Sequence, residues 1–311
     1  MKTIPQRLAE ALAAQEHQIQ AAILLLDNGA SVPFIARYRK EATGGLDDTQ
    51  LRTLEERLRY LRELDERRQV ILNSIQQQDK LTAALETTIN EAETKTRLED
   101  LYLPYKPKRR TKAQIAREAG LEPLATALLS QPELVPEHAA QAYINAKQGI
   151  DNTQHALEGA RQILMEKYAE EAELLGQLRS YIWEHAVLTA KVVDGEQERG
   201  TKFADYFDYQ ENLKNIPSHR ALALFRGRNE GILQLRLSID NDTDKAPNYC
   251  ERTIAHHFQI ADQGRAADQW LLDTVRWAWR FKIRLHLDSE LLMQVREAAE
   301  TEAIKVFASI Y

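Results

Sequence analysis

The sequence has a single cysteine, Cys250, among its 311 residues. One cysteine forms neither an intramolecular disulfide nor a thiolate metal cluster. No apolar run approaches the ~20 residues that a membrane-spanning helix needs, and the charged N-terminal segment does not resemble a secretory signal. With only 12 Gly and 9 Pro, the composition is that of an ordinary globular protein. We therefore expect a cytoplasmic protein without a membrane segment.

Motifs that place catalytic or cofactor-binding groups are also missing. The sequence contains no Walker-type loop, GxGxxG, HExxH or Ser-His-Asp arrangement. His256 and His257 are adjacent, so on a helix they point about 100° apart and do not clamp a metal as an i, i+4 pair does. We therefore expect no enzyme activity, no cofactor and no metal.

Charge is unevenly distributed along the chain. The net charge is −6, from 41 Lys and Arg against 47 Asp and Glu, and a field of that sign weakly repels a polyanion. The run LYLPYKPKRRTKAQIAREAG, residues 101–120, instead holds six basic residues and one acidic residue, Glu118. Its basic residues and tyrosines suit a phosphate backbone and stacked bases. The candidate nucleic-acid-binding residues in this run are Lys106, Lys108, Arg109, Arg110, Lys112 and Arg117.

The alternative interpretation of this run is a solvated linker whose tyrosines pack on neighbouring helices. Pro104 and Pro107 keep it extended, because each disfavours the α region for the residue before it. Two other clusters are further candidates for phosphate contacts, with a solvated helix face as the alternative for each. They consist of Arg37 and Lys40 in VPFIARYRKEA and of Arg226 and Arg228 on either side of Gly227.

Helical periodicity dominates the first third of the chain. Residues 6–28 predict one or two amphipathic helices that end at Asn28-Gly29. Ser31 is placed to cap a short helix that ends before Gly44-Gly45. Asp47 and Gln50 form a capping box for a long helix, whose buried face we expect to contain Leu51, Leu54, Leu58, Leu61, Leu64, Ile71, Leu72 and Ile75.

Further helices are expected near residues 82–93, 96–103, 112–119, 122–130 and 137–147. Ala116, Gly120 and Pro123 have the spacing of a helix-turn-helix, although the second helix offers no Arg or Lys to reach bases. A long helical stretch then runs from Asp151 to about Lys191, with a break near Gly176. The best strand candidate is 232–239, for which no partner of comparable quality is visible, and a lone strand needs one.

These patterns predict a mainly all-α fold, a multi-helix bundle with a helix-turn-helix-like portion and at most one short β element near 232–239. The expected regions are 1–110, an N-terminal helical region; 111–191, a helix-turn-helix-like and long-helix region; and 192–311, a C-terminal helical region. The amphipathic pattern is still running at Tyr311, which suggests that the natural protein continues.

Three stretches resemble the N-terminal part of the bacterial Tex transcription accessory proteins. They are VPFIARYRKEATGGLDDTQL, LEDLYLPYKPKRRTKAQIAREAGLEPLA and IPSHRALALFRGRNEGIL. The resemblance implies a cytoplasmic nucleic-acid-binding protein linked to transcription. It also implies that an RNase-H-like domain, helix-hairpin-helix modules and an OB-fold RNA-binding domain follow the helical region. This sequence stops before them, so the strand near 232–239 is expected to find a partner in that missing part.

The resemblance implies a helical scaffold that positions nucleic-acid-binding modules and adds sequence-independent phosphate contacts to RNA or DNA. The alternative function is a protein-interaction scaffold without nucleic-acid binding of its own. Its leucine-rich and tryptophan-bearing helices would dock RNA polymerase, ribosomal components or the rest of its own chain.

Overall fold

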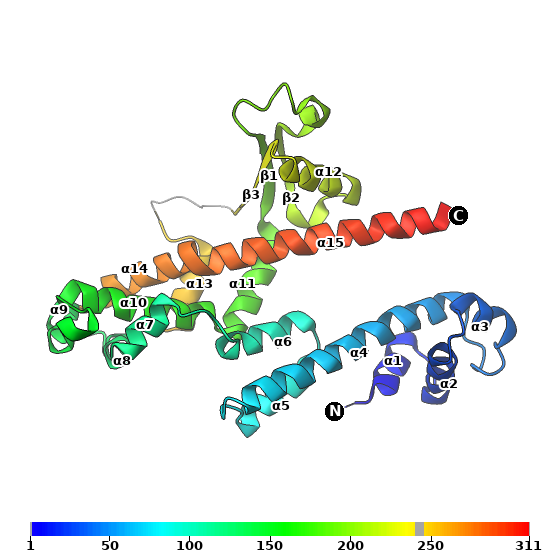
Figure 1. Cartoon of the computed structure of the whole chain (residues 1–311), viewed down its shortest axis with the longest axis horizontal. Helices are drawn as coiled ribbons and strands as arrows, with labels where there is room; N and C mark the ends of the chain where they lie inside the picture. Colours follow the sequence, from blue (N-terminus) through cyan, green and yellow to red (C-terminus); the bar gives the residue numbers. More distant parts are fainter. Residues whose placement is uncertain (1, 240–245, 311) are drawn as a thin grey trace. The chain divides into compact units, whose positions relative to one another are not determined.

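The structure is a computed structural model that describes residues 2–239 and 246–310, with side chains described as far as residue 306. The chain divides into two compact units, Met1–Lys106 and Pro107–Tyr311, and it is mainly helical with one small sheet (Figure 1). The expected all-α class is therefore confirmed. The three regions expected from the sequence stay a prediction.

The first unit is organised around one long helix, α4, Asp48–Gln76. The other helices of this unit all pack against it. They are α1 (Ile4–Leu12), α2 (Glu16–Asp27), α3 (Val32–Tyr38), α5 (Ala83–Glu91) and α6 (Lys95–Tyr102), and a 3₁₀ turn, Leu103–Tyr105, follows α6. All eight apolar positions expected on the inner face of α4 are buried in the core of this unit.

Local signals fix the ends of these helices. The Asp47 carboxylate accepts a hydrogen bond from the backbone N–H of Gln50 at 2.7 Å, and the Gln50 side chain accepts one from the backbone N–H of Asp47 at 3.1 Å. This is the expected capping box. Gly29 follows α2 with a φ of +83°, a conformation that favours glycine. Ser31 stands at the N-cap of α3, but its side chain makes no capping hydrogen bond.

Two helices form the centre of the second unit, α10 (Thr153–Ala169) and α15 (Arg284–Ile310). α10 contacts α7 (Lys112–Glu118), α8 (Glu122–Ser130), α9 (Pro136–Ala140) and α14 (Asp268–Ala278). A π-helical segment, Trp279–Ile283, joins α14 to α15. The remaining helices are α11 (Ala172–His185), α12 (Ser218–Asn229) and α13 (Tyr249–His257).

Two helical expectations are wrong in detail. The stretch after Asp151 breaks between Ala169 and Ala172, and Gly176 lies inside α11. A Cβ at Gly176 would meet nothing within 4 Å, and a single glycine in a helix costs only about 1 kcal/mol. The helix expected at 137–147 is α-helical only over Pro136–Ala140 and continues as separate 3₁₀ turns, Gln141–Tyr143 and Ala146–Gln148.

A three-stranded antiparallel sheet lies in the second unit. The strands are β1 (Val187–Val192), β2 (Asp208–Asn212) and β3 (Leu233–Ser238), in the order β2-β1-β3. Val187 stands opposite Asn212 on one side and Ser238 on the other. Figure 1 shows α12 beside this sheet, and α12 packs on both β3 and α15.

The sheet corrects two expectations from the sequence. The strand near 232–239 is confirmed as β3, but its partner is β1, within this chain. The helix expected to reach Lys191 ends at His185, and residues 187–191 are strand. Leu188 and Ala190 are buried while their neighbours are less so, which is the alternation of a half-buried strand.

Across the described ranges 2–239 and 246–310, no helix combines the length and the apolar character that crossing a membrane requires.

Candidate nucleic-acid interface

The tyrosines of the basic run are structural. Tyr102 is buried, and its hydroxyl lies 2.9 Å from the Ser74 hydroxyl. The Arg67 guanidinium lies 5.5 Å from the centre of the Tyr102 ring, and the Gln78 side chain donates to the Tyr105 carbonyl at 2.8 Å. These contacts hold the tyrosines on the first unit, so Tyr102 is not available to stack on a base.

Three basic residues of the run are held by acidic residues within the second unit. Lys108 forms an ion pair with Glu170. Arg110 donates from Nε to Glu118 at 3.0 Å, and Arg117 donates to Glu166 at 2.5 Å. Glu166 and Glu170 lie at the end of α10, so the run is fastened to α10 at two points.

Glu166 is the most buried of these acids. Burial alone raises the pKa of Glu166, but hydrogen bonds donated by Arg117 and by the Thr111 hydroxyl, at 3.0 Å, outweigh burial and hold that pKa below its ordinary value. Thr111 also accepts from the backbone N–H of Gln114 and so caps α7. For Glu170 burial outweighs the Lys108 contact and raises the pKa. Glu166 is therefore the firmer anchor of the two.

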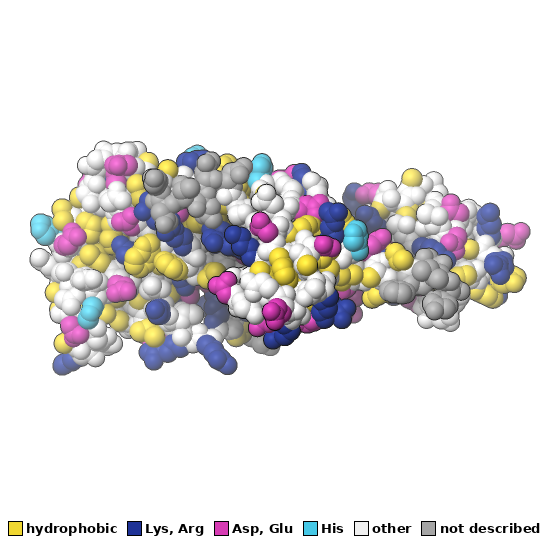
Figure 2. All heavy atoms as spheres, turned by 90° about the horizontal axis from the view of Figure 1, so that it is seen from above, with side chains coloured by type: hydrophobic (Ala, Val, Ile, Leu, Met, Phe, Trp, Pro, Cys, Tyr) yellow, Lys and Arg dark blue, Asp and Glu magenta, His cyan; other side chains and the backbone are white. Residues whose placement is uncertain are grey.

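The other three basic residues of the run remain available. Lys106, at the end of the first unit, and Arg109 and Lys112, in the second, are all exposed. Among the described residues none of the three makes an ion pair or a side-chain hydrogen bond. The run thus combines anchored and unpaired cations. Figure 2 shows Lys and Arg side chains interspersed with acidic and hydrophobic ones on the drawn face.

A helix pair follows the run, as expected. α7 and α8 are joined by a tight turn in which Gly120 has a φ of +81° and the backbone N–H of Leu121 donates to the Ala116 carbonyl at 3.0 Å. The exposed polar residues of α8 are Glu122, Thr126 and Ser130. That this pair is a helix-turn-helix stays a prediction.

The two other basic clusters differ from each other. Arg37 and Lys40 are exposed, and no ion pair is formed by either within the described ranges. Arg226 donates to Glu230 at 3.0 Å, and the Arg228 guanidinium lies 5.1 Å from the centre of the Phe225 ring. The first cluster therefore keeps its charge available, whereas Arg226 shares the Glu230 carboxylate with Lys202.

The anchoring acids Glu166 and Glu170 are the residues that the sequence analysis missed. They lie 49 and 62 positions from their partners. No local spacing signals such contacts, because they arise only when α7 packs against α10.

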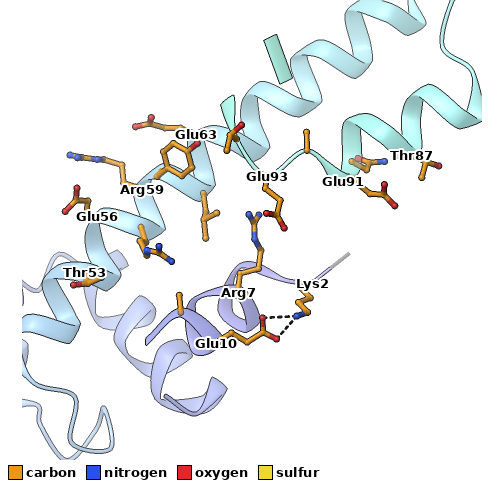
Figure 3. Close-up of a pocket in the computed structure, with 17 residues that line it drawn as sticks. Lys2, Arg7, Glu10, Thr53, Glu56, Arg59, Glu63, Thr87, Glu91 and Glu93 are labelled. Carbon is orange, nitrogen blue, oxygen red and sulfur yellow. Dashed lines mark hydrogen bonds and ion pairs between the residues drawn. The ribbon is translucent and has the colours of Figure 1, made fainter. Parts of the chain in front are cut away.

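A pocket of about 1740 Å³ lies in the first unit. Figure 3 shows acidic and basic side chains together in its wall, among them Arg7 and Glu10 of α1 and Arg59 and Glu63 of α4. Lys2 pairs with Glu10 at 2.6 Å. Five Glu and four basic residues line the pocket, so it offers no net positive charge to a polyanion. No group of His, Cys, Asp and Glu suited to hold a metal occurs among the described residues.

Family models match most of this chain. Residues 2–76 match the Tex-like protein N-terminal domain, and residues 131–307 match the Tex central region-like family. Protein YhgF of Escherichia coli is 57% identical over 303 residues, which are 97% of this chain and 39% of that protein. The transcriptional accessory protein Tex of Neisseria gonorrhoeae is 54% identical over 303 residues, again 97% and 39%.

A human relative is more distant. The S1 RNA-binding domain-containing protein 1 of Homo sapiens is 30% identical over 237 residues, which are 73% of this chain and 24% of that protein. The chain spans about two fifths of the length of its bacterial relatives. The Tex resemblance seen in the sequence is confirmed by these matches: the chain belongs to the Tex-like family and corresponds to its N-terminal and central regions.

Proposed function

We propose that this chain is a helical, non-catalytic scaffold of a Tex-like transcription accessory protein that adds sequence-independent phosphate contacts to RNA or DNA. The observation that carries the proposal is the basic run, in which Lys106, Arg109 and Lys112 are exposed and unpaired while their neighbours are anchored. A cytoplasmic location belongs to the same proposal.

The anchored residues matter because they limit how the run can move. Lys108 and Arg117 are tied to the end of α10, and Thr111 caps α7. Arg109 and Lys112 lie between these points, so their charges are presented without a local acid to neutralise them. Contacts to phosphates alone carry no sequence information and weaken with salt, because binding releases counterions.

The names of the relatives agree with this ligand class. One bacterial relative is called a transcriptional accessory protein, and the human relative is named for an S1 RNA-binding domain. We infer that association with the transcription machinery and with nucleic acid belongs to the whole Tex-like protein, to which this chain contributes its part.

A double substitution tests the phosphate contacts. Fluorescent single- and double-stranded oligonucleotides are titrated with the wild type and with R109A/K112A at ~50 mM salt. We expect affinity for both forms to fall at least about fivefold, because two phosphate contacts are lost. The matched control is R52A/R296A, which removes the same charge from arginines already paired with Asp48 and Glu300. Equal losses in the two variants, or no binding by the wild type, would contradict the proposal.

An exposed apolar stripe favours the second candidate function, protein docking. Trp277 of α14, Phe281 of the π-helical segment and Leu285 of α15 recur every four residues, and Phe281 and Leu285 are 61% and 59% exposed. We infer that the occupant is the remainder of a Tex-like protein, since the bacterial relatives are more than twice as long as this chain.

The docking candidate predicts that the remaining portion of the Escherichia coli relative binds this chain in sedimentation experiments. F281S/L285S should abolish the complex, because two apolar contacts become polar, whereas the control L24S/V70S, on exposed residues of the first unit, should leave it intact. If F281S/L285S leaves the complex unaffected, this stripe is not the docking surface.

A further inference from the structure

A second exposed aromatic surface lies on α3 in the first unit. Val32 and Ile35 are buried and hold α3 on α4, with which it is in contact. Phe34 and Tyr38, four residues apart, point the other way and are 42% and 63% exposed. Their ring centres are 5.4 Å apart with 45° between the ring planes. An isolated exposed apolar residue is ordinary, but two adjacent aromatic rings form a surface.

Three exposed cations lie close to these rings in the sequence. Arg37, Arg39 and Lys40 are exposed, and the Arg39 guanidinium lies 5.8 Å from the centre of the Phe34 ring. Within the described part of the chain none of the three forms an ion pair, and neither does Glu41, the nearest acid in sequence. Some other cations of the same unit are paired, for example Arg62 with Asp27 and Lys95 with Glu63.

The backbone behind this surface is fixed by its own contacts. The Thr43 hydroxyl, in a buried residue, donates to the Lys40 carbonyl at 3.1 Å. The Gln18 side chain of α2 donates to the Gly44 carbonyl at 2.7 Å. Gly44 has a φ of +62°, and a Cβ there would lie 2.7 Å from the Gln18 side chain. The turn after α3 is therefore held in one conformation, which limits the entropy lost when a ligand binds.

We propose that α3 and the turn after it form a binding site for single-stranded nucleic acid. Bases stack on Phe34 and Tyr38 while Arg37, Arg39 and Lys40 contact the adjoining phosphates. Aromatic rings accept any base because every base has a π face, and paired bases of a duplex are not exposed to them. A protein partner has less to gain here, because three unpaired cations beside two rings match a polyanion better than an apolar face.

The site deepens the proposed function and rests on it for the class of ligand. It differs in its location, since it lies on α3 of the first unit while Arg109 and Lys112 lie in the second. It also differs in its chemistry, since it discriminates single strands from duplexes. Phosphate contacts by Arg109 and Lys112 make no such distinction.

The test compares F34L/Y38L, which keeps apolar side chains but removes the rings, with the wild type. The probes are a fluorescent oligothymidylate, a duplex of the same length and an abasic oligonucleotide with the same number of phosphates. We expect affinity for the single strand to fall about tenfold or more, since stacking on two rings is lost. Affinities for the duplex and the abasic probe should change less than about twofold, since phosphate contacts persist.

Two further variants complete the experiment. R37Q/K40Q should weaken binding of all three probes, because phosphate contacts are lost without loss of the rings. Y249L, which removes a partly exposed ring of the second unit outside both candidate binding surfaces, is the control and should bind all three probes as the wild type does. Circular dichroism and urea unfolding check that each variant is folded. We expect F34L/Y38L to fold as the wild type does, because both rings are exposed.

Single-strand affinity unchanged in F34L/Y38L would overturn the site while the proposed function stands, provided that R109A/K112A still weakens binding. If R109A/K112A binds as the wild type does while F34L/Y38L loses affinity for the single strand, the phosphate contacts of the basic run are overturned and the site on α3 stands. If the wild type binds no probe, both are overturned. If F34L/Y38L instead converts a sedimenting dimer to a monomer without affecting the single strand, the surface is a contact between copies of the chain and the site is wrong.

Discussion

Glu166 is the residue on which the geometry of the basic run depends most. It accepts hydrogen bonds from Thr111, which precedes α7, and from Arg117, in the last turn of α7. Removing it would leave the half-buried Arg117 charge short of its main partner and Thr111 without an acceptor for its hydroxyl.

The expected result for Glu166→Ala is a fall of about 2 kcal/mol in the free energy of unfolding, since the partly buried Arg117 charge loses its closest partner and keeps only Glu122, at 3.5 Å. Urea unfolding at neutral pH measures it. Glu118→Ala, which breaks the exposed pair with Arg110, is the matched control and should lower the free energy of unfolding clearly less, because an exposed ion pair contributes little to stability. Equal losses of unfolding free energy in the two variants would mean that Glu166 does not hold the basic run on α10.

Acid should weaken the same contact. Because its partners hold the pKa of Glu166 below the ordinary 4.5, its contribution to stability is full above pH 4.5 and is lost as the pH falls through the folded-state pKa. The difference in unfolding free energy between wild type and Glu166→Gln should therefore shrink from pH 7 to about pH 3.5 in urea titrations. A difference that grows on acidification would contradict this assignment.

At the scale of elements, the capping box of Asp47 and Gln50 fixes the residue at which α4 begins. Asp47→Ala removes an acceptor for the first turn of α4 and should lower the free energy of unfolding by about 1 kcal/mol. Ser31→Ala is the matched control, because Ser31 also stands at an N-cap but its side chain makes no capping hydrogen bond. Chemical denaturation of both variants checks the difference, and a cost at Ser31 as large as at Asp47 would show that capping is not its cause.

The elements that can be predicted from the sequence are those specified by residues that are close together in it. The α4 leucines and the capping box at Asp47 are set by residues three or four apart, so they are visible in the sequence. β1 is not, because Val187 pairs with Asn212 and Ser238, which are distant in sequence. For the same reason the basic run was predicted as a stretch of charge, while its division into anchored and unpaired residues depends on Glu166 and Glu170 of α10.

For the whole molecule, the net charge of −6 means that attraction to a polyanion is local. Within the described ranges both proposed contact sites keep unpaired cations, Arg37 to Lys40 in the first unit and Arg109 with Lys112 in the second. Other exposed cations, such as Arg228, are also without an ion pair there. On the face drawn in Figure 2, acidic and basic side chains are interspersed, which weakens nonspecific attraction to that face. This distribution favours contacts to the backbone of a nucleic acid at defined places.

The central claim, that the run contacts phosphates, is tested most directly by the salt dependence of affinity. The logarithm of the association constant for a single strand is plotted against the logarithm of salt concentration for wild type and R109A/K112A. Each lost phosphate contact should reduce the slope by about 0.7, so the variant should be shallower by about 1.4. Parallel lines for wild type and variant would show that Arg109 and Lys112 contact no phosphate.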